Sequence, residues 1–117
     1  MNDRVVKLLR DAVEHGERGR TFVADYSFAQ YKEYDLLRSG VERELSIVGE
    51  ALQQMRRQDA ELADSIPEVG EVIGLRNRLV HGYHQTDDRV VYDTMREPLA
   101  ELLVRLRALL GEQAEPT

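Results

Sequence analysis

Apolar residues recur at steps of three and four along most of the chain, which is the repeat of an amphipathic α-helix. Four segments carry this pattern. The first begins after Asn2 or Asp3, either of which suits a helix N-cap, and Gly16 and Gly19 predict its end. The second runs from about residue 32 to about residue 58. Its apolar stripe consists of Leu37, Val41, Leu45, Val48, Leu52 and Met55.

The other two helical segments lie beyond a connection predicted over residues 59–67. Pro67 suits the first turn of the third helix, which is predicted to stop at Gly82. Asp87 or Asp88 is the expected cap of the fourth helix, and Pro98 falls inside its pattern, where it predicts a kink or a loosened turn. The fourth stripe consists of Val91, Met95, Leu99, Leu102, Leu103, Leu106, Leu109 and Leu110.

These patterns predict an all-α protein that folds as an up-and-down four-helix bundle. Ser27 can cap a short turn between the first two long helices, so the pattern allows one extra short helix. The length of 117 residues predicts one domain over residues 1–117, with a frayed tail from about residue 112.

Composition narrows the possible classes of protein. The chain has no cysteine, which excludes a disulfide scaffold, a thiol nucleophile and cysteine-ligated zinc. It has no apolar run of a signal peptide and none of the roughly 18 residues that a membrane span needs, so we expect a cytoplasmic protein without a membrane partner. The formal net charge of −6 argues against broad duplex binding, and nucleic-acid contacts would need a local basic focus.

The third helix carries the most unusual residues, in the stretch GLRNRLVHGYHQTD over residues 74–87. On a helical wheel Arg76 falls in the middle of the apolar arc, whereas Arg78 points toward solvent. Arg76 therefore has two explanations: a structural ion pair, or a cation at the mouth of an anion site. Glu44 lies within the apolar arc of the second helix and is the candidate partner in a structural pair, and both explanations can hold together.

His81 and Asn77 lie four residues apart and share a border strip of the helix. A histidine at a helix C-terminus is more often a cap than a catalyst, because the negative end of the helix dipole favours the imidazolium. Tyr83, just past the predicted helix end, would by default be a rim residue that packs on its neighbours. Each of these residues alone has an ordinary structural reading.

Taken together, RNRLVHGY resembles the motif of the HepT-like toxins of the HEPN superfamily. That motif is an arginine, four residues, a histidine, one residue and a tyrosine, usually with asparagine directly after the arginine. The segment IVGEAL over residues 47–52 also resembles the second helix of that family, with Gly49 allowing close approach between helices. The resemblance covers nearly the whole chain, whereas the mixed-charge VERELS around Glu44 departs from the family.

This resemblance implies a type VII-like toxin, a metal-independent endoribonuclease that cuts RNA without a cofactor at the cleft of a homodimer. Arg76, Asn77 and His81 would be its catalytic residues. It further implies that a partner nucleotidyltransferase, an MntA-like antitoxin, silences the toxin by attaching AMP to Tyr83. The negative charge of the AMP group would then repel RNA phosphate beside Arg76.

Three other classes remain open. A non-catalytic HEPN module that pairs with a nucleotidyltransferase would carry the same motif. A metal site is conceivable from HxxHxxDD, which combines His81 and His84 with Asp87 and Asp88, although Gly82 breaks the helix between the histidines. A plain dimeric bundle would leave the complete motif as a coincidence.

Overall fold

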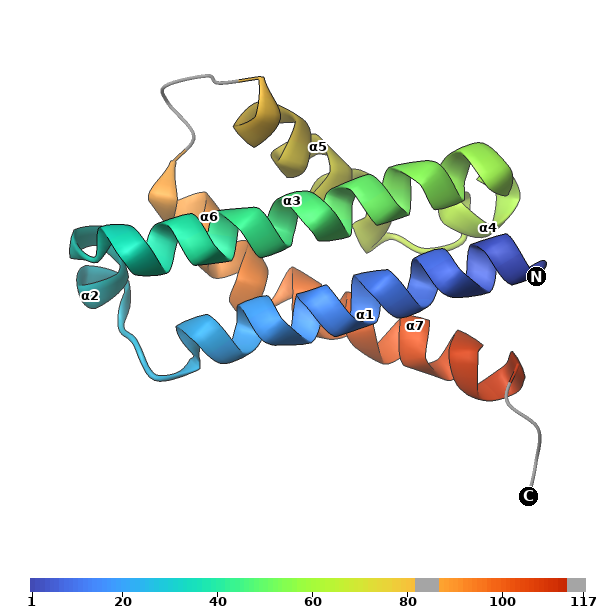
Figure 1. Cartoon of the computed structure of the whole chain (residues 1–117), viewed down its shortest axis with the longest axis horizontal. Coiled ribbons are helices and arrows are strands. Elements are labelled where there is room, and N and C mark those ends of the chain that lie inside the picture. The colour runs from blue at the N-terminus through green and yellow to red at the C-terminus, as the bar shows by residue number, and fades with distance from the viewer. Residues whose placement is uncertain (82–86, 114–117) are drawn as a thin grey trace.

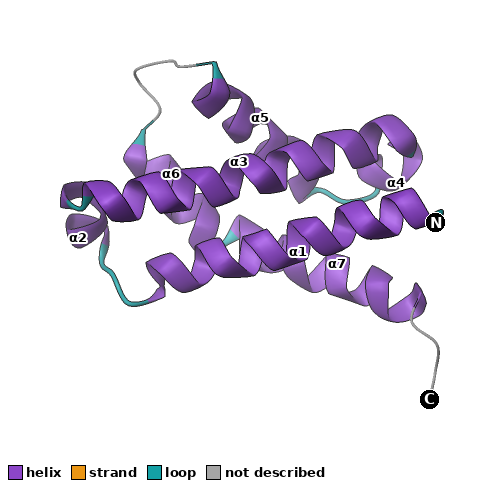
Figure 2. Ribbon diagram, in the orientation of Figure 1, coloured by secondary structure: helices purple, strands orange, loops and turns teal. Residues whose placement is uncertain are grey.

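The computed structural model describes residues 1–81 and 87–113, and within these residues every regular element is an α-helix (Figure 2). Four helical segments form the bundle, as the sequence predicts, and each is called a layer below. Two short helices, rather than one, join the long ones. In chain order the helices are α1 Asp3–Ala24, α2 Phe28–Glu33, α3 Asp35–Gln58, α4 Ala60–Asp64, α5 Glu68–Val80, α6 Asp88–Arg96 and α7 Pro98–Gln113.

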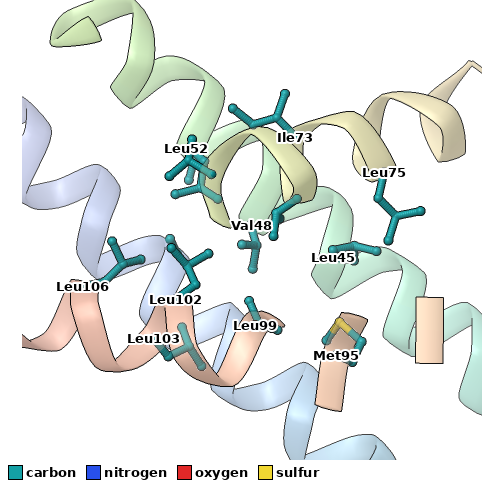
Figure 3. Packing of buried hydrophobic residues seen from close by; sticks show 14 of the residues in the cluster. Leu45, Val48, Leu52, Ile73, Leu75, Met95, Leu99, Leu102, Leu103 and Leu106 are labelled. Atoms are coloured by element: carbon teal, nitrogen blue, oxygen red, sulfur yellow. The ribbon is translucent and has the colours of Figure 1, made fainter. Parts of the chain in front are cut away.

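Helix α3 is the central element of the bundle. It runs antiparallel to α1 along almost its full length, and α5 packs on another side of it (Figure 1). Helices α6 and α7 together form the fourth layer, which lies against α1 and α5. The core between these helices takes buried apolar residues from α1, α3, α5, α6 and α7. Figure 3 shows part of it, with leucines of α3 and α7 packed near Ile73 and Leu75 of α5.

Helix boundaries follow local capping where the sequence offers a cap. The side chain of Asn2 accepts a hydrogen bond from Val5 N, and Asp87 caps α6 by accepting one from Arg89 N. Ser27 forms a capping box with Gln30, which starts α2. The predicted caps at these three positions are confirmed.

The first helix does not end at Gly16 or Gly19, which corrects the prediction from sequence. It continues to Ala24, and both glycines are buried inside it. A Cβ at Gly16 would lie 2.8 Å from Leu103 Cδ2, and one at Gly19 would collide with Met95 Cε. These glycines therefore stay in the helix because they allow close packing against α6 and α7, which outweighs the low helix propensity of glycine.

Other predicted boundaries need smaller corrections. The long second helix begins at Asp35 rather than near Lys32, because Tyr34 is extended and separates α2 from α3. The connection over 59–67 contains α4, which Asp59 caps. The predicted stop at Gly82 and most of the predicted tail from about residue 112 fall outside the described residues, and α7 itself extends to Gln113.

The break at Pro98 divides the fourth layer into two helices. Helix α6 ends at Arg96, and Glu97 has non-helical dihedral angles of −121° and −69°. Proline cannot donate an N–H to the preceding turn and restricts the conformation of the residue before it. The interruption is thus stronger than the kink expected from sequence, although both halves contribute apolar residues to the core.

The packing of α5 against α3 at Gly49 yields a prediction about stability. We expect Gly49→Ala to lower the free energy of unfolding by about 1–3 kcal/mol, because the added methyl group would collide with the Arg76 stem. Gly74→Ala is the matched control, since a Cβ there meets nothing within 4 Å. That change should raise stability by up to about 1 kcal/mol. Urea denaturation of both variants measures the difference, and equal effects at the two glycines would contradict the packing argument.

Candidate functional site

Arg76 lies where α5 packs against α3 at Gly49. Gly49 on α3 has no side chain, and the space that a Cβ would fill is occupied by Cβ and Cγ of Arg76. The Arg76 side chain is only 19% exposed, so its apolar stem is packed between the helices while its guanidinium reaches the edge. This confirms the prediction that Gly49 allows close helix approach.

The Arg76 guanidinium makes three polar contacts with other described residues. Its Nη2 lies 2.7 Å from Glu50 Oε2, and its Nη1 donates to Gln53 Oε1 at 3.2 Å and to Asn77 Oδ1 at 3.1 Å. Arg76 Nε is buried and has no hydrogen-bond partner among the described residues. The contacts fix the plane of the guanidinium, because its five donors have a rigid arrangement.

Asn77 connects Arg76 to the end of the helix. Its side-chain oxygen accepts from Arg76, and its backbone carbonyl oxygen accepts from the backbone N–H of His81 at 3.1 Å. His81 is the C-cap residue of α5 and is exposed to solvent. Arg76, Asn77 and His81 therefore lie within the last two turns of one helix.

Glu44 is not the partner of Arg76, contrary to the sequence prediction. Its burial is confirmed, with 2% of its surface exposed, but its carboxylate binds residues of α1. His15 Nδ1 lies 2.8 Å from Glu44 Oε2, and Arg18 Nη1 lies 3.3 Å from Oε1. Glu50 follows Glu44 by six positions, which places it about 9 Å farther along α3 and about 120° away around the helix. The two carboxylates therefore face different neighbouring helices.

The remaining predictions for α5 have mixed outcomes. Arg78 is exposed, as the helical wheel predicts, so the two arginines of LRNRL differ in environment. Val80, the last residue of α5, is 50% exposed, whereas Leu75 is 1% exposed. The bundle no longer covers the end of α5 at Val80. Tyr83, His84 and Gly82 lie outside the described residues.

Sequence reasoning missed Glu50 and Gln53 as partners of Arg76. The signal was available in Gly49, because a residue next to a close helix crossing is placed to contact the facing helix. Residues 50 and 53 follow the glycine by one and four positions and therefore border the same crossing.

Two features of the described residues bear on other classes of function. No group of three or more His, Cys, Asp or Glu residues among them is arranged to hold a metal ion. The HxxHxxDD candidate includes His84, which lies outside the described residues. No described helix is long and apolar enough to cross a membrane.

Comparison with known proteins identifies the relatives of this sequence. The model of the family described as "Ribonuclease HepT-like" matches residues 12–109. This range includes α5 with Arg76, Asn77 and His81. The chain belongs to the HepT-like ribonuclease family. A relative from Caldanaerobacter subterraneus subsp. tengcongensis, named "Putative RNase", is 25% identical over 91 residues, which cover 78% of this chain and 80% of the relative.

A second relative, from Methanocaldococcus jannaschii, also carries the name "Putative RNase". It is 28% identical over 103 residues, which cover 87% of this chain and 94% of that protein. No solved structure matches the chain significantly.

The different environments of Glu44 and Glu50 in this HepT-like protein generate a prediction. Glu44→Gln should lower the free energy of unfolding by about 1–3 kcal/mol, because it weakens hydrogen bonds to a buried charged group. Glu50→Gln on the same helix should lower it by at most about 1 kcal/mol, since the Glu50 side chain is 40% exposed and solvent screens its pair with Arg76. Thermal and urea denaturation measure both, and a larger loss in Glu50→Gln would reverse the assignment.

Proposed function

We propose that the protein is the toxin of a type VII-like toxin–antitoxin pair and acts in the cytoplasm as a metal-independent endoribonuclease. Membership of the HepT-like ribonuclease family supports the class of reaction. The observation that carries the assignment of residues is the double role of Asn77. It holds the Arg76 guanidinium through its side chain and receives the His81 N–H at its carbonyl oxygen.

RNA supplies its own nucleophile, so this reaction needs few groups from the protein. The 2′-hydroxyl attacks the adjacent phosphorus, the bond to the 5′-oxygen breaks, and a 2′,3′-cyclic phosphate remains. His81 accepts the proton of the 2′-hydroxyl or donates one to the leaving 5′-oxygen. Arg76 stabilises the negative charge on the non-bridging oxygens in the transition state.

Glu50 must share Arg76 with the phosphate in this mechanism. Of the five donors of the guanidinium, the contacts to Glu50, Gln53 and Asn77 use three. Glu50 is half-exposed, so its carboxylate can turn toward solvent when a phosphate oxygen replaces it at Nη2. Glu50 then keeps Arg76 extended in the free protein, while Gln53 and Asn77 keep the guanidinium in place during the reaction.

We further propose that two copies of the chain form the active cleft. A second His81 supplies the opposite proton transfer, since one histidine acts as base and the other as acid. A second Arg76 doubles the local positive charge, which matters in a chain with a formal net charge of −6.

Cleavage of single-stranded RNA tests this mechanism. We expect products that end in a 2′,3′-cyclic phosphate, formed equally well in EDTA because no step requires a metal. Arg76→Ala and His81→Ala should each lower the rate at least about 100-fold, the usual size of a general acid–base or charge-stabilising contribution. Gel electrophoresis of labelled RNA and mass spectrometry of the products measure both effects.

Arg78→Ala is the control for charge, since Arg78 is an exposed neighbour on the same helix. It should leave the rate near that of the wild type. Activity lost in EDTA and restored by zinc or manganese would favour the HxxHxxDD metal site instead. RNA that binds without being cut would favour the non-catalytic HEPN module.

Control of the toxin is proposed to act through Tyr83. The phenolic oxygen of Tyr83 attacks the α-phosphorus of ATP, pyrophosphate leaves, and the phenolic proton passes to a base of the partner nucleotidyltransferase. The resulting AMP group brings negative charge near Arg76 and so disfavours RNA phosphate. Tyr83 follows His81 by two residues, so the AMP group would act close to the proposed catalytic residues.

Mass spectrometry after co-expression with an MntA-like nucleotidyltransferase tests this control. We expect one or more AMP units on Tyr83, loss of ribonuclease activity, and neither effect in Tyr83→Phe. Tyr34 is 42% exposed and is the internal control for indiscriminate modification. Tyr92 is 6% exposed, and its hydroxyl donates to Tyr26 O at 2.5 Å, so it should stay unmodified. AMP on any tyrosine other than Tyr83 would refute the assignment.

A further inference from the structure

A groove of about 700 Å³ lies between α1 and α3, the two helices that run side by side in Figure 1. It extends from the N-terminal turns of α1 to the middle of that helix. Arg4 and His15 lie at its two ends, eleven residues apart, which corresponds to about 16 Å along the helix. The charged and titratable part of its lining is Arg4, Lys7, Asp11, His15, Arg43 and Glu50.

A chain of hydrogen bonds joins this groove to the candidate catalytic site. Arg4 Nη2 donates to Gln54 Oε1 at 2.8 Å, and Gln54 Nε2 donates to Glu50 Oε1 at 3.0 Å. The other oxygen of Glu50 binds Arg76 Nη2 at 2.7 Å. Glu50 thus belongs both to the groove and to the Arg76 site, and the two are neighbours across the exposed side of α3.

The opposite end of the groove holds an oriented histidine. Because the Glu44 carboxylate can only accept, the 2.8 Å contact requires His15 Nδ1 to carry the proton. Glu44 is itself buried under α1, and Arg18 donates to its second oxygen. The remaining ring nitrogen, Nε2, lies 3.9 Å from the exposed Glu14, and the His15 side chain is 20% exposed. His15 is therefore held in a fixed orientation at the groove wall.

The sign of charge in the groove differs from that of the chain. Three Lys or Arg residues and two Asp or Glu residues line it, whereas the whole chain has 16 and 22. The cationic residues also lie along its length rather than at one point. Arg4 donates to the neutral amide of Gln54, so that contact leaves its charge uncompensated. Lys7 lies 3.1 Å from Asp11 and Arg43 lies 3.6 Å from Glu44, but both cations are exposed, so solvent screens these pairs and a phosphate can compete for them. A local basic focus of this kind is what an acidic protein needs in order to bind a polyanion.

We propose that the α1–α3 groove binds the phosphate backbone of the single-stranded RNA whose scissile phosphate lies at Arg76. This inference rests on the ribonuclease function proposed above. Arg4 and Lys7 contact the phosphates that lie one or more nucleotides from the cut. Arg43 contacts a phosphate farther along the groove. Such contacts bind the strand without reading its sequence, because phosphates are the same at every nucleotide.

The salt dependence of RNA binding tests the groove directly. The probe is a fluorescein-labelled oligonucleotide of about 20 nucleotides with 2′-O-methyl groups, which cannot be cut because the nucleophile is blocked. Fluorescence anisotropy gives the affinity of the wild-type chain at several KCl concentrations. For a single strand, the slope of log K against log salt is negative, and each lost phosphate contact reduces its magnitude by about 0.7. Arg4→Ala/Lys7→Ala should therefore reduce the magnitude by about 1.4.

Arg10→Ala/Arg57→Ala is the matched control, because it removes the same formal charge from exposed positions on α1 and α3 outside the groove. The control should retain the wild-type slope. Equal losses in both double variants would mean that only net charge matters, and an unchanged slope in Arg4→Ala/Lys7→Ala would mean that the groove is not used. Either result overturns the proposal. Sedimentation showing that only Arg4→Ala/Lys7→Ala dissociates a dimer would also overturn it, because the loss of binding would then follow from the loss of the dimer.

Cleavage of unmodified RNA by the wild-type chain separates this proposal from the one it rests on. RNA that is cut, together with a slope that does not change in Arg4→Ala/Lys7→Ala, refutes the groove and leaves the ribonuclease. Groove-dependent binding of RNA that is never cut refutes the ribonuclease and leaves the binding site. If both proposals hold, the variant should mainly raise KM for a long RNA, because the contacts lie away from the reacting phosphate.

Discussion

The packing of Arg76 against Gly49 is the constraint on which the candidate site depends. An arginine stem can be buried between two helices only if the facing helix leaves room, and any side chain larger than hydrogen at residue 49 would occupy that room. Once the stem is held there, its guanidinium lies beside Glu50, Gln53 and Asn77. A feature of backbone packing thus determines where the positive charge of the site is placed.

Helix α3 contacts α1 and α5 through two different carboxylates at different positions along its length. Glu44 is buried and binds His15 and Arg18 of α1, so these contacts hold α1 against α3. Glu50 is half-exposed and binds Arg76 of α5, where solvent can reach the pair. A buried charge must keep its partner, whereas an exposed carboxylate can exchange one cation for another. The first contact therefore suits structure and the second suits ligand binding.

The sequence was sufficient for the helical layers because their apolar periodicity is long and regular. It was insufficient for glycine, since Gly16 and Gly49 have the same local signal and the partner across the interface decides whether a glycine ends a helix or allows close packing. The helical wheel identified Arg76 as an unusual cation in an apolar arc. The sequence then suggested Glu44 as its ion-pair partner, whereas the structure has Glu50 in that place. Burial of a carboxylate indicates that it needs a partner, but which helix supplies that partner depends on the three-dimensional arrangement.

The central claim is that the α3–α5 approach at Gly49 places Arg76 for catalysis. The most direct measurement is the rate of RNA cleavage by Gly49→Ala, with Gly74→Ala as reference, at a temperature where both variants are folded. The account predicts that Gly49→Ala lowers kcat at least about tenfold, because displacement of the guanidinium by even about 1 Å weakens transition-state contacts, while Gly74→Ala keeps the wild-type rate. A folded Gly49→Ala protein that cuts RNA as fast as the wild type would contradict it.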